Sequence, residues 1–152
     1  MSSKPSQYIK GWVEFYKLKF KITPDVLIPR PETELLVDEA IRFLSNRPER
    51  TKRVEGSPIF TILDVGTGAG NIAISIAKNL DQVGIVGTDI SKRAIKVAIQ
   101  NAKFHKIGTD KVVFIHNDLL EKFTKAPDII VTNLPYIPSA RIPYLDSSVK
   151  DY

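Results

Sequence analysis

An α/β fold built on a parallel sheet is predicted by three features of the 152-residue sequence. First, short apolar strands alternate with amphipathic helices after position 58, a rhythm typical of parallel sheets with helices on their faces. Second, a glycine-rich turn follows the first of these strands. Third, aromatic and β-branched residues alternate loosely over residues 8–28, which indicates an N-terminal β-hairpin or edge strands.

The individual elements follow from the spacing of apolar residues. A helix is expected at residues 33–44, with Thr33 as its N-cap, and a polar loop at 45–58. Two more helices are expected, one at residues 71–80 and one after the N-cap Ser91. Strands are expected at residues 59–65, 83–88, 112–116 and 128–132. The side chains expected to point inward from the helices are Leu36, Val37, Ala40, Ile41 and Leu44; Ile72, Ala73, Ile76, Ala77 and Leu80; and Ala94, Ile95, Ala98, Ile99 and Ala102.

The composition is that of one soluble globular domain and excludes several chemistries. Apolar residues make up 43% of the chain and charged residues 26%. The absence of cysteine excludes disulfides, thiolate metal sites and cysteine nucleophiles, and with two histidines no metal site is expected. No apolar run approaches the ~20 residues that span a bilayer, and the N-terminus lacks the apolar core of a signal peptide. A cytoplasmic location without a membrane partner is therefore expected.

The formal net charge of +5 favours encounter with an acidic partner such as nucleic acid. However, the basic residues are scattered along the chain, apart from a short run at residues 47–53. A well-solvated basic surface is the simpler interpretation.

The glycine-rich turn at residues 64–70 is expected to bind a ligand. In open α/β sheets ligands lie at the carboxyl ends of the strands, and glycine lets the backbone approach them closely. The spacing is not the dinucleotide fingerprint, because Asn71 stands where its third glycine would be, and the turn is no P-loop, because it lacks Gly-Lys-Ser/Thr. A carboxylate before the turn also disfavours a phosphate ligand. The candidate ligand residues are Asp64, Gly66, Thr67, Gly68 and Gly70.

The pattern D-x-G-x-G-x-G resembles motif I of class I methyltransferases, which bind S-adenosylmethionine. The methionine end of this cofactor is zwitterionic, and Asp64 can answer its positive charge directly or through water. Asp89, with Ile90 beside it, ends the second strand and can accept from both ribose hydroxyls. Asp118, after the third strand, resembles the residue that accepts from the adenine amino group, with Leu119 against the ring.

Two further segments narrow the resemblance. Residues 133–136, Asn-Leu-Pro-Tyr, resemble the N-P-P-Y motif of amino-group methyltransferases, with leucine in place of the first proline. Residues 26–34, V-L-I-P-R-P-E-T-E, together with that motif resemble the HemK-like family of peptide-chain release factor glutamine N5-methyltransferases. The resemblance implies a Rossmann-like class I methyltransferase fold. It also implies methyl transfer from S-adenosylmethionine to the side-chain amide nitrogen of a glutamine in a release factor.

This resemblance gives individual residues a role. A glutamine amide nitrogen is a poor nucleophile, so two acceptors that hold its hydrogens can aim it at the methyl group. The candidates are the side-chain oxygen of Asn133 and the backbone carbonyl of Leu134, a carbonyl that leucine supplies as well as proline does. Tyr136 can stack on the planar amide. The expected catalytic residues are Asn133, Leu134, Pro135 and Tyr136, and the expected substrate-binding residues are Arg30, Pro31, Glu32, Asn133 and Tyr136. Asn133 is also expected to contact the cofactor.

The chain is expected to hold only part of the implied fold, about four of seven core strands. Residues 1–32 would form the hairpin and a proline-rich linker, and residues 33–152 a cofactor-binding core whose C-terminal part is missing. The fourth strand would then be an exposed sheet edge, through which chains can self-associate.

Two alternatives to a release-factor methyltransferase stay open. An N6-adenine methyltransferase of DNA or RNA would use the same N-P-P-Y chemistry and suit a basic chain. Residues 29–34 and the lack of a clustered basic and aromatic strip make this nucleic-acid substrate less favoured. The other alternative is an inactive cofactor-binding fragment, which the missing strands would explain.

Overall fold

The computed structural model describes residues 5–46, 60–121 and 123–134. Its N-terminal elements are α1 (Ser6–Lys10), β1 (Trp12–Phe15), β2 (Leu18–Lys21), the 3-10 helix η1 (Pro31–Thr33) and α2 (Glu34–Ser45). The remaining elements are β3 (Phe60–Val65), α3 (Asn71–Asn79), β4 (Val83–Asp89), α4 (Lys92–Phe104), β5 (Val112–His116) and β6 (Ile129–Thr132). The expected strands and helices are all present, while most of the loop expected at 45–58 lies outside the described residues.

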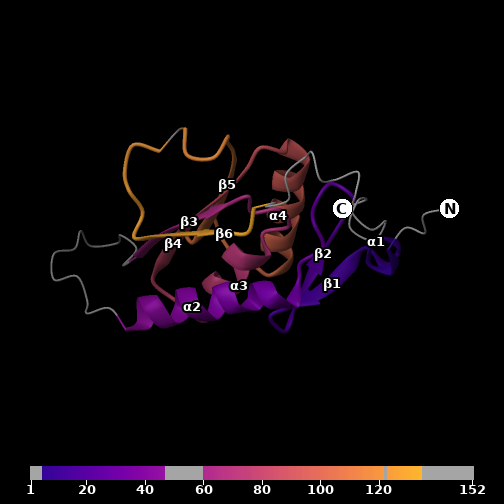
Figure 1. Ribbon diagram of the computed structural model, residues 1–152, viewed down its shortest axis with the longest axis horizontal. Coiled ribbons are helices and arrows are strands. Elements are labelled where there is room, and N and C mark those ends of the chain that lie inside the picture. Colours follow the sequence, from indigo (N-terminus) through magenta and orange to yellow (C-terminus); the bar gives the residue numbers. More distant parts are fainter. Residues whose placement is uncertain (1–4, 47–59, 122, 135–152) are drawn as a thin grey trace, which may run out of the picture.

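Strands β3 to β6 form one parallel sheet in the order β5-β4-β3-β6, which confirms the predicted sheet (Figure 1). The chain leaves β3 for β4 and β5 and then returns to the other side of β3 with β6. At the carboxyl ends of the neighbouring strands β3 and β6, Val65 is in register with Thr132. The loops after β3 and β6 therefore lie side by side, at the switch point where open α/β sheets bind ligands.

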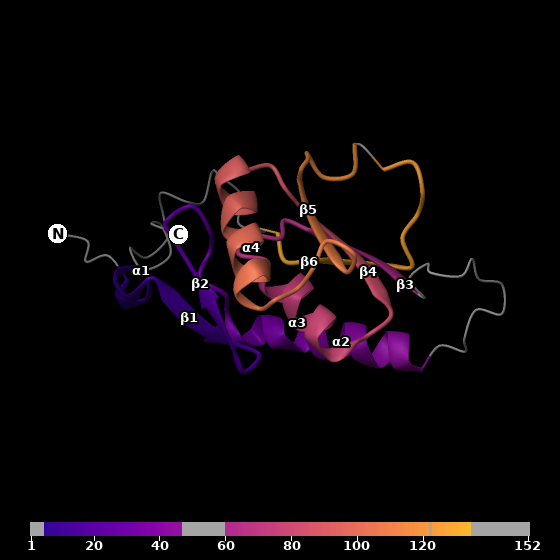
Figure 2. The ribbon, with the colours of Figure 1, turned by 180° about the vertical axis from the view of Figure 1, so that it is seen from behind.

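Helices α2, α3 and α4 pack on one face of this sheet (Figures 1 and 2). Alternate strand residues such as Ile62, Ile85 and Val112 point into the helical layer and form the main core with it. Because α3 packs against the sheet and is flanked by both α2 and α4, every residue from Asn71 to Ala77 is buried. In the described residues the helices cover this one face, because the segment joining β5 to β6 forms no helix there.

The N-terminal hairpin is confirmed. β1 and β2 pair antiparallel, and the two residues between them, Tyr16 and Lys17, have φ angles of 51° and 59°, as tight hairpin turns require. The turn is fixed to α2, because the Tyr16 amide donates to Glu34 Oε1 at 2.7 Å and the Tyr16 hydroxyl donates to Asp38 Oδ1 at 2.6 Å. The bond to Asp38, with burial as the second cause, raises the pKa of Tyr16 to about 12.

Some local expectations are corrected and one is confirmed. The alternating segment begins with α1, whose end is marked by Gly11 at φ 75°. Thr33 lies at the expected N-cap position of α2, but its backbone is helical and its side chain makes no capping bond. Ser91 does cap α4, by accepting from the backbone of the first turn at 3.2 Å. On α4, Ile99 is 38% exposed, and Asn101 is buried instead.

No helix in the described ranges is long and apolar enough to cross a membrane. In those same ranges no group of three or more histidine, aspartate or glutamate side chains could hold a metal ion. The chain contains no cysteine that could add to such a group.

Candidate functional site

The glycine-rich turn after β3 adopts a conformation that depends on its glycines. Gly66, Gly68 and Gly70 all have positive φ angles, of 73°, 53° and 78°. A Cβ atom on Gly66 would lie 2.6 Å from Leu134 Cδ2, so a glycine there lets the loop after β6 approach the turn. A Cβ atom on Gly68 would meet nothing within 4 Å, so the turn is open to solvent on this side.

Asp64 is the last residue of β3 that faces the helices, and its carboxylate is hydrogen-bonded within and behind the glycine-rich turn. It is fully buried, and its Oδ2 accepts from Thr67 Oγ1 at 2.7 Å and from the Ala73 amide at 3.3 Å. Its other oxygen, Oδ1, is buried and has no hydrogen-bond partner among the described residues. Burial raises the pKa of Asp64 to about 6, against the opposing effect of its two hydrogen bonds. Asp64 Oδ1 can therefore accept a hydrogen bond from a positively charged group or from another donor.

Asp89, at the end of β4, is fixed beside the turn by two backbone amides. Its Oδ2 accepts from the Gly68 amide at 3.0 Å, and its Oδ1 accepts from the Ser91 amide at 2.8 Å. A carboxylate oxygen has two lone pairs, so each Asp89 oxygen can accept one more hydrogen. The neighbouring Ile90 is 67% exposed and adds an apolar surface next to this carboxylate.

The segment after β5 brings a third group to the same edge. The backbone N–H of Asn117 donates to the backbone carbonyl of Asp89 at 3.1 Å, which ties this segment to the end of β4. Asn117 is buried and its side chain donates to the Leu119 carbonyl at 3.1 Å, where the backbone has a positive φ of 44°. Asp118 and Leu119 are thereby held exposed beside Asp89. No role for Asn117 was predicted from the sequence, although a polar residue directly after a mainly apolar strand could have indicated one.

Asn133 follows β6 and lies next to the glycine-rich turn across the switch point. Its side-chain nitrogen Nδ2 donates to Thr33 Oγ1 at 3.1 Å. The preceding Thr132 hydroxyl donates to the Val65 carbonyl at 3.0 Å, which holds the ends of β6 and β3 together. Leu134 contacts Gly66 through its side chain, a role that the sequence did not suggest. Pro135 and Tyr136 lie outside the described residues.

The segment before α2, residues 30–33, contacts the groups at the carboxyl edge of the sheet through one residue in the described chain. Arg30, Pro31 and Glu32 are exposed, and Pro31 begins η1. No hydrogen bond or ion pair in the described chain joins these three residues to the glycine-rich turn. The residue of this segment that does reach the cluster is Thr33, through Asn133.

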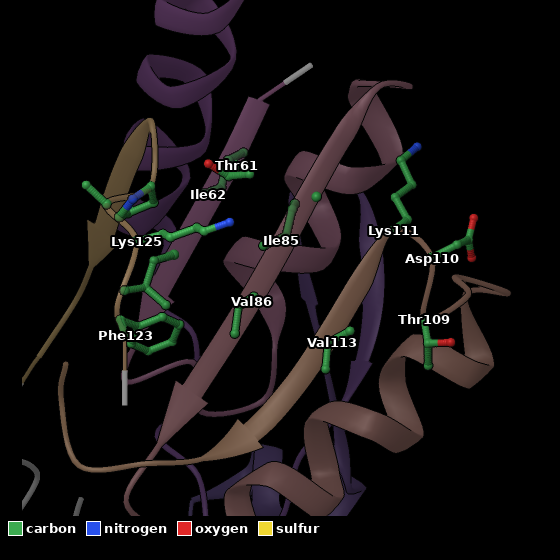
Figure 3. Close-up of a pocket in the computed structure, with 14 residues that line it drawn as sticks. Thr61, Ile62, Ile85, Val86, Thr109, Asp110, Lys111, Val113, Phe123 and Lys125 are labelled. Carbon is green, nitrogen blue, oxygen red and sulfur yellow. The ribbon is translucent and has the colours of Figure 1, made fainter. Parts of the chain in front are cut away.

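A hollow of about 320 Å³ lies elsewhere, on the sheet face away from α2, α3 and α4 (Figure 3). Its lining includes Val86, Val113, Phe123 and Lys125. It shares no residue with the turn, with Asp89 or with Asn133. We therefore assign the candidate site to the carboxyl edge of the sheet and not to this hollow.

This edge has an acidic residue at or near the end of each of three strands and an asparagine after a fourth, and a comparison by sequence agrees with this arrangement. The model of the methyltransferase small domain family matches residues 37–142, which is more than half of the chain. The chain belongs to the methyltransferase small domain family.

Curated relatives of this methyltransferase domain include the release factor glutamine methyltransferases of Lactococcus lactis subsp. lactis and Fusobacterium nucleatum subsp. nucleatum, at 41% and 40% identity. The two matches cover 99% and 98% of the chain but only 50% and 39% of those proteins. The chain thus spans half or less of the length of these relatives. The expected resemblance to release-factor glutamine methyltransferases is confirmed.

Solved structures agree with the predicted class I methyltransferase fold. The ribosomal protein L11 methylase of Lactobacillus delbrueckii subsp. bulgaricus is 28% identical, with a TM-score of 0.57 over 83% of this chain and 58% of that chain. A human methyltransferase 10 domain containing protein has a TM-score of 0.60 over 80% of this chain and 56% of that chain. Because it is 19% identical, the human protein supports the fold alone.

Proposed function

We propose that this methyltransferase domain transfers a methyl group from S-adenosylmethionine to the side-chain amide nitrogen of a glutamine in a peptide-chain release factor. The observation that carries the proposal is the position of Asn133, beside the glycine-rich turn and with its amide nitrogen engaged by Thr33. The substrate follows from the names of the relatives, which are release factor glutamine methyltransferases. A cytoplasmic location, where release factors act, is part of the proposal.

The described residues fit the cofactor. The unpartnered Oδ1 of Asp64 suits the ammonium group of its methionine end, and Asp89 has a free lone pair on each oxygen for the two ribose hydroxyls. Asp118 and Leu119 would hold the adenine ring at the end of β5. The open side of the turn at Gly68 leaves room for the ligand. When bound, S-adenosylmethionine supplies an electrophilic methyl group on a sulfonium.

The chain's contribution to the transfer is to position the acceptor amide. In the proposed step, Asn133 Oδ1 and the Leu134 carbonyl accept the two hydrogens of the glutamine amide and aim its nitrogen at the methyl carbon. This nitrogen would take the methyl group from the bound cofactor, which would keep the electron pair of the broken carbon–sulfur bond, so the nitrogen gains one bond and must lose one proton. The nitrogen then releases one proton to water, so no side chain need act as a base before transfer. Tyr136 would stack on the amide, and Arg30, Pro31 and Glu32 would contact the substrate.

The experiment incubates the 152-residue chain with methyl-labelled cofactor and, separately, with release factor, DNA and RNA. We expect label in release factor only, and no label when its target glutamine is replaced by alanine. Label only in nucleic acid would instead support an N6-adenine methyltransferase, for which the net charge of +5 is the favouring observation. Cofactor binding without any transfer would support an inactive fragment.

A substitution connects this activity to the site. Asn133→Ala should lower kcat for release factor by about a hundredfold, because a misplaced acceptor loses its alignment with the methyl group. The dissociation constant of the cofactor should stay within about threefold, since most of the expected cofactor contacts come from residues of other strands and not from Asn133. Asn79→Ala, at the far end of α3, removes the same amide group away from the site and should have wild-type kcat.

A further inference from the structure

Thr33 makes a contact that its position in the sequence does not explain. It ends η1, it is 6% exposed, and its Oγ1 lies 3.1 Å from Asn133 Nδ2. The two residues are 100 positions apart. The hydroxyl is not used for helix capping, since its side chain makes no bond to the first turn of α2.

The contact between Thr33 and Asn133 bears on how the Asn133 side-chain amide is oriented, since the two ends of this amide differ. A primary amide donates from its nitrogen and accepts at its oxygen, and the two ends can exchange by a rotation about one bond. A partner that occupies the nitrogen leaves the oxygen turned elsewhere. We propose that Thr33 is a positioning residue that holds the Asn133 nitrogen and thereby presents Asn133 Oδ1 to the acceptor amide. This inference rests on the proposed function and deepens it by adding a residue that no substrate touches.

The surroundings hold Thr33 itself in place. On its N-terminal side, Pro31 fixes the backbone of η1, and the Thr33 amide donates to the Arg30 carbonyl at 3.0 Å. On its C-terminal side, Glu34 is bound at 2.7 Å to the amide of Tyr16 in the hairpin turn. The hydroxyl is therefore presented from a rigid segment, as the orientation of a second group requires.

The kinetic test compares two substitutions. Thr33→Val has nearly the same shape and lacks the hydroxyl, so it should lower kcat for release factor by about tenfold or more through misplacement of Asn133. KM and the cofactor dissociation constant should change by less than about threefold, because Thr33 lies outside the proposed binding contacts. Thr33→Ser keeps the hydroxyl and should restore kcat to within about threefold of wild type. Thermal unfolding of both variants shows whether either is misfolded.

Two comparisons make the positioning role falsifiable. In an Asn133→Ala background, Thr33→Val should cause no further loss of kcat, because the group it orients is gone. A wild-type kcat in Thr33→Val, an equal loss in Thr33→Ser, or additive losses in the double variant would each overturn the proposal.

A third measurement separates this inference from the proposed function. The side-chain 15N and 1H resonances of Asn133 should shift in Thr33→Val and return in Thr33→Ser, whether or not the chain methylates anything. If the wild-type chain labels no glutamine, the proposed function fails, and these resonances still decide whether Thr33 holds the amide. Unchanged resonances in Thr33→Val would overturn the positioning role even in an active enzyme.

Discussion

Asp64 combines complete burial with one unpartnered carboxylate oxygen. In the free protein its burial favours the neutral acid and raises its pKa to about 6, from an ordinary value of 3.8. Folding therefore stabilises the protonated form. An ammonium group at Oδ1 would reverse this preference, because opposite charges nearby favour the carboxylate. Cofactor binding and loss of the Asp64 proton should be coupled.

This coupling predicts how cofactor affinity depends on pH. Above pH 6 Asp64 is already charged in the free protein, so the affinity for S-adenosylhomocysteine should be level. Below pH 6 a proton must be released on binding, so affinity should fall by up to about tenfold for each pH unit. Isothermal titration calorimetry between pH 5 and pH 7.5 in buffers of different ionisation enthalpy would measure both the affinity and the proton.

Asp64→Asn supplies the control for that titration. Its affinity should be low throughout and independent of pH over the same range, because no proton is exchanged at this position. An unchanged pH profile in Asp64→Asn would show that another group is responsible and that Asp64 does not face the ammonium group.

At the scale of elements, α4 joins the hairpin to the glycine-rich turn through Asn101. Asn101 is 1% exposed, and its Nδ2 donates to the Ala69 carbonyl at 2.8 Å and to the Lys21 carbonyl at 3.0 Å. Its Oδ1 accepts from the Lys21 amide at 2.8 Å. These three hydrogen bonds join the Asn101 side chain to three backbone groups, and each bond is buried or partly buried. The end of β2 and the turn are therefore held at a fixed separation.

Asn101→Ala should destabilise the fold and loosen the turn. It leaves three backbone groups without partners, which would lower the free energy of unfolding by about 3 kcal/mol. Because one of these groups is the Ala69 carbonyl, cofactor affinity should fall as well. Urea unfolding and calorimetry measure the two effects, with the exposed Gln100→Ala as the matched control on the same helix. A stability loss with unchanged affinity would mean that the turn does not depend on this bridge.

The periodicity of apolar residues was sufficient to predict the strands and helices of the sheet domain, because this spacing directly reflects which face of each element meets the core. It was less reliable at single positions. On α4 the stripe was assigned to Ile99, whereas the buried position is that of Asn101, a polar residue whose partners come from β2 and the turn. The helical spacing from Ala94 and Ala98 allowed position 101 to face inward, but Asn101 is polar and so was not counted among the apolar residues that define the buried face.

The candidate site was predictable where one loop holds the signal and not where distant segments meet. The glycine-rich turn and Asp89 follow strand ends, so the sequence alone places them at one edge. The contact between Thr33 and Asn133 depends on tertiary packing across 100 positions. From the sequence, the best local explanation for Thr33 was a helix cap, but in the structure its side chain makes no capping bond.

At the scale of the whole molecule, the sheet has one covered face and one with exposed apolar side chains. On the face away from the helices, Val113 of β5 is 39% exposed and Ile130 of β6 is 48% exposed. The hollow lined by Val86 and Phe123 lies on the same face (Figure 3). Among the described strands β6 pairs on one side only, with β3. Apolar faces and unpaired strand edges both favour association with other chains.

We therefore expect the 152-residue chain to self-associate with rising concentration, as sedimentation velocity would measure. Ile130→Lys should shift the chain toward monomer, because a charge on this face must be desolvated in any interface that covers it. Ile99→Lys makes the same change at a similarly exposed isoleucine of α4, on the other side of the sheet, and should leave the association unchanged. A chain that stays monomeric at every concentration, or that responds equally to both substitutions, would show that this face and edge do not drive assembly.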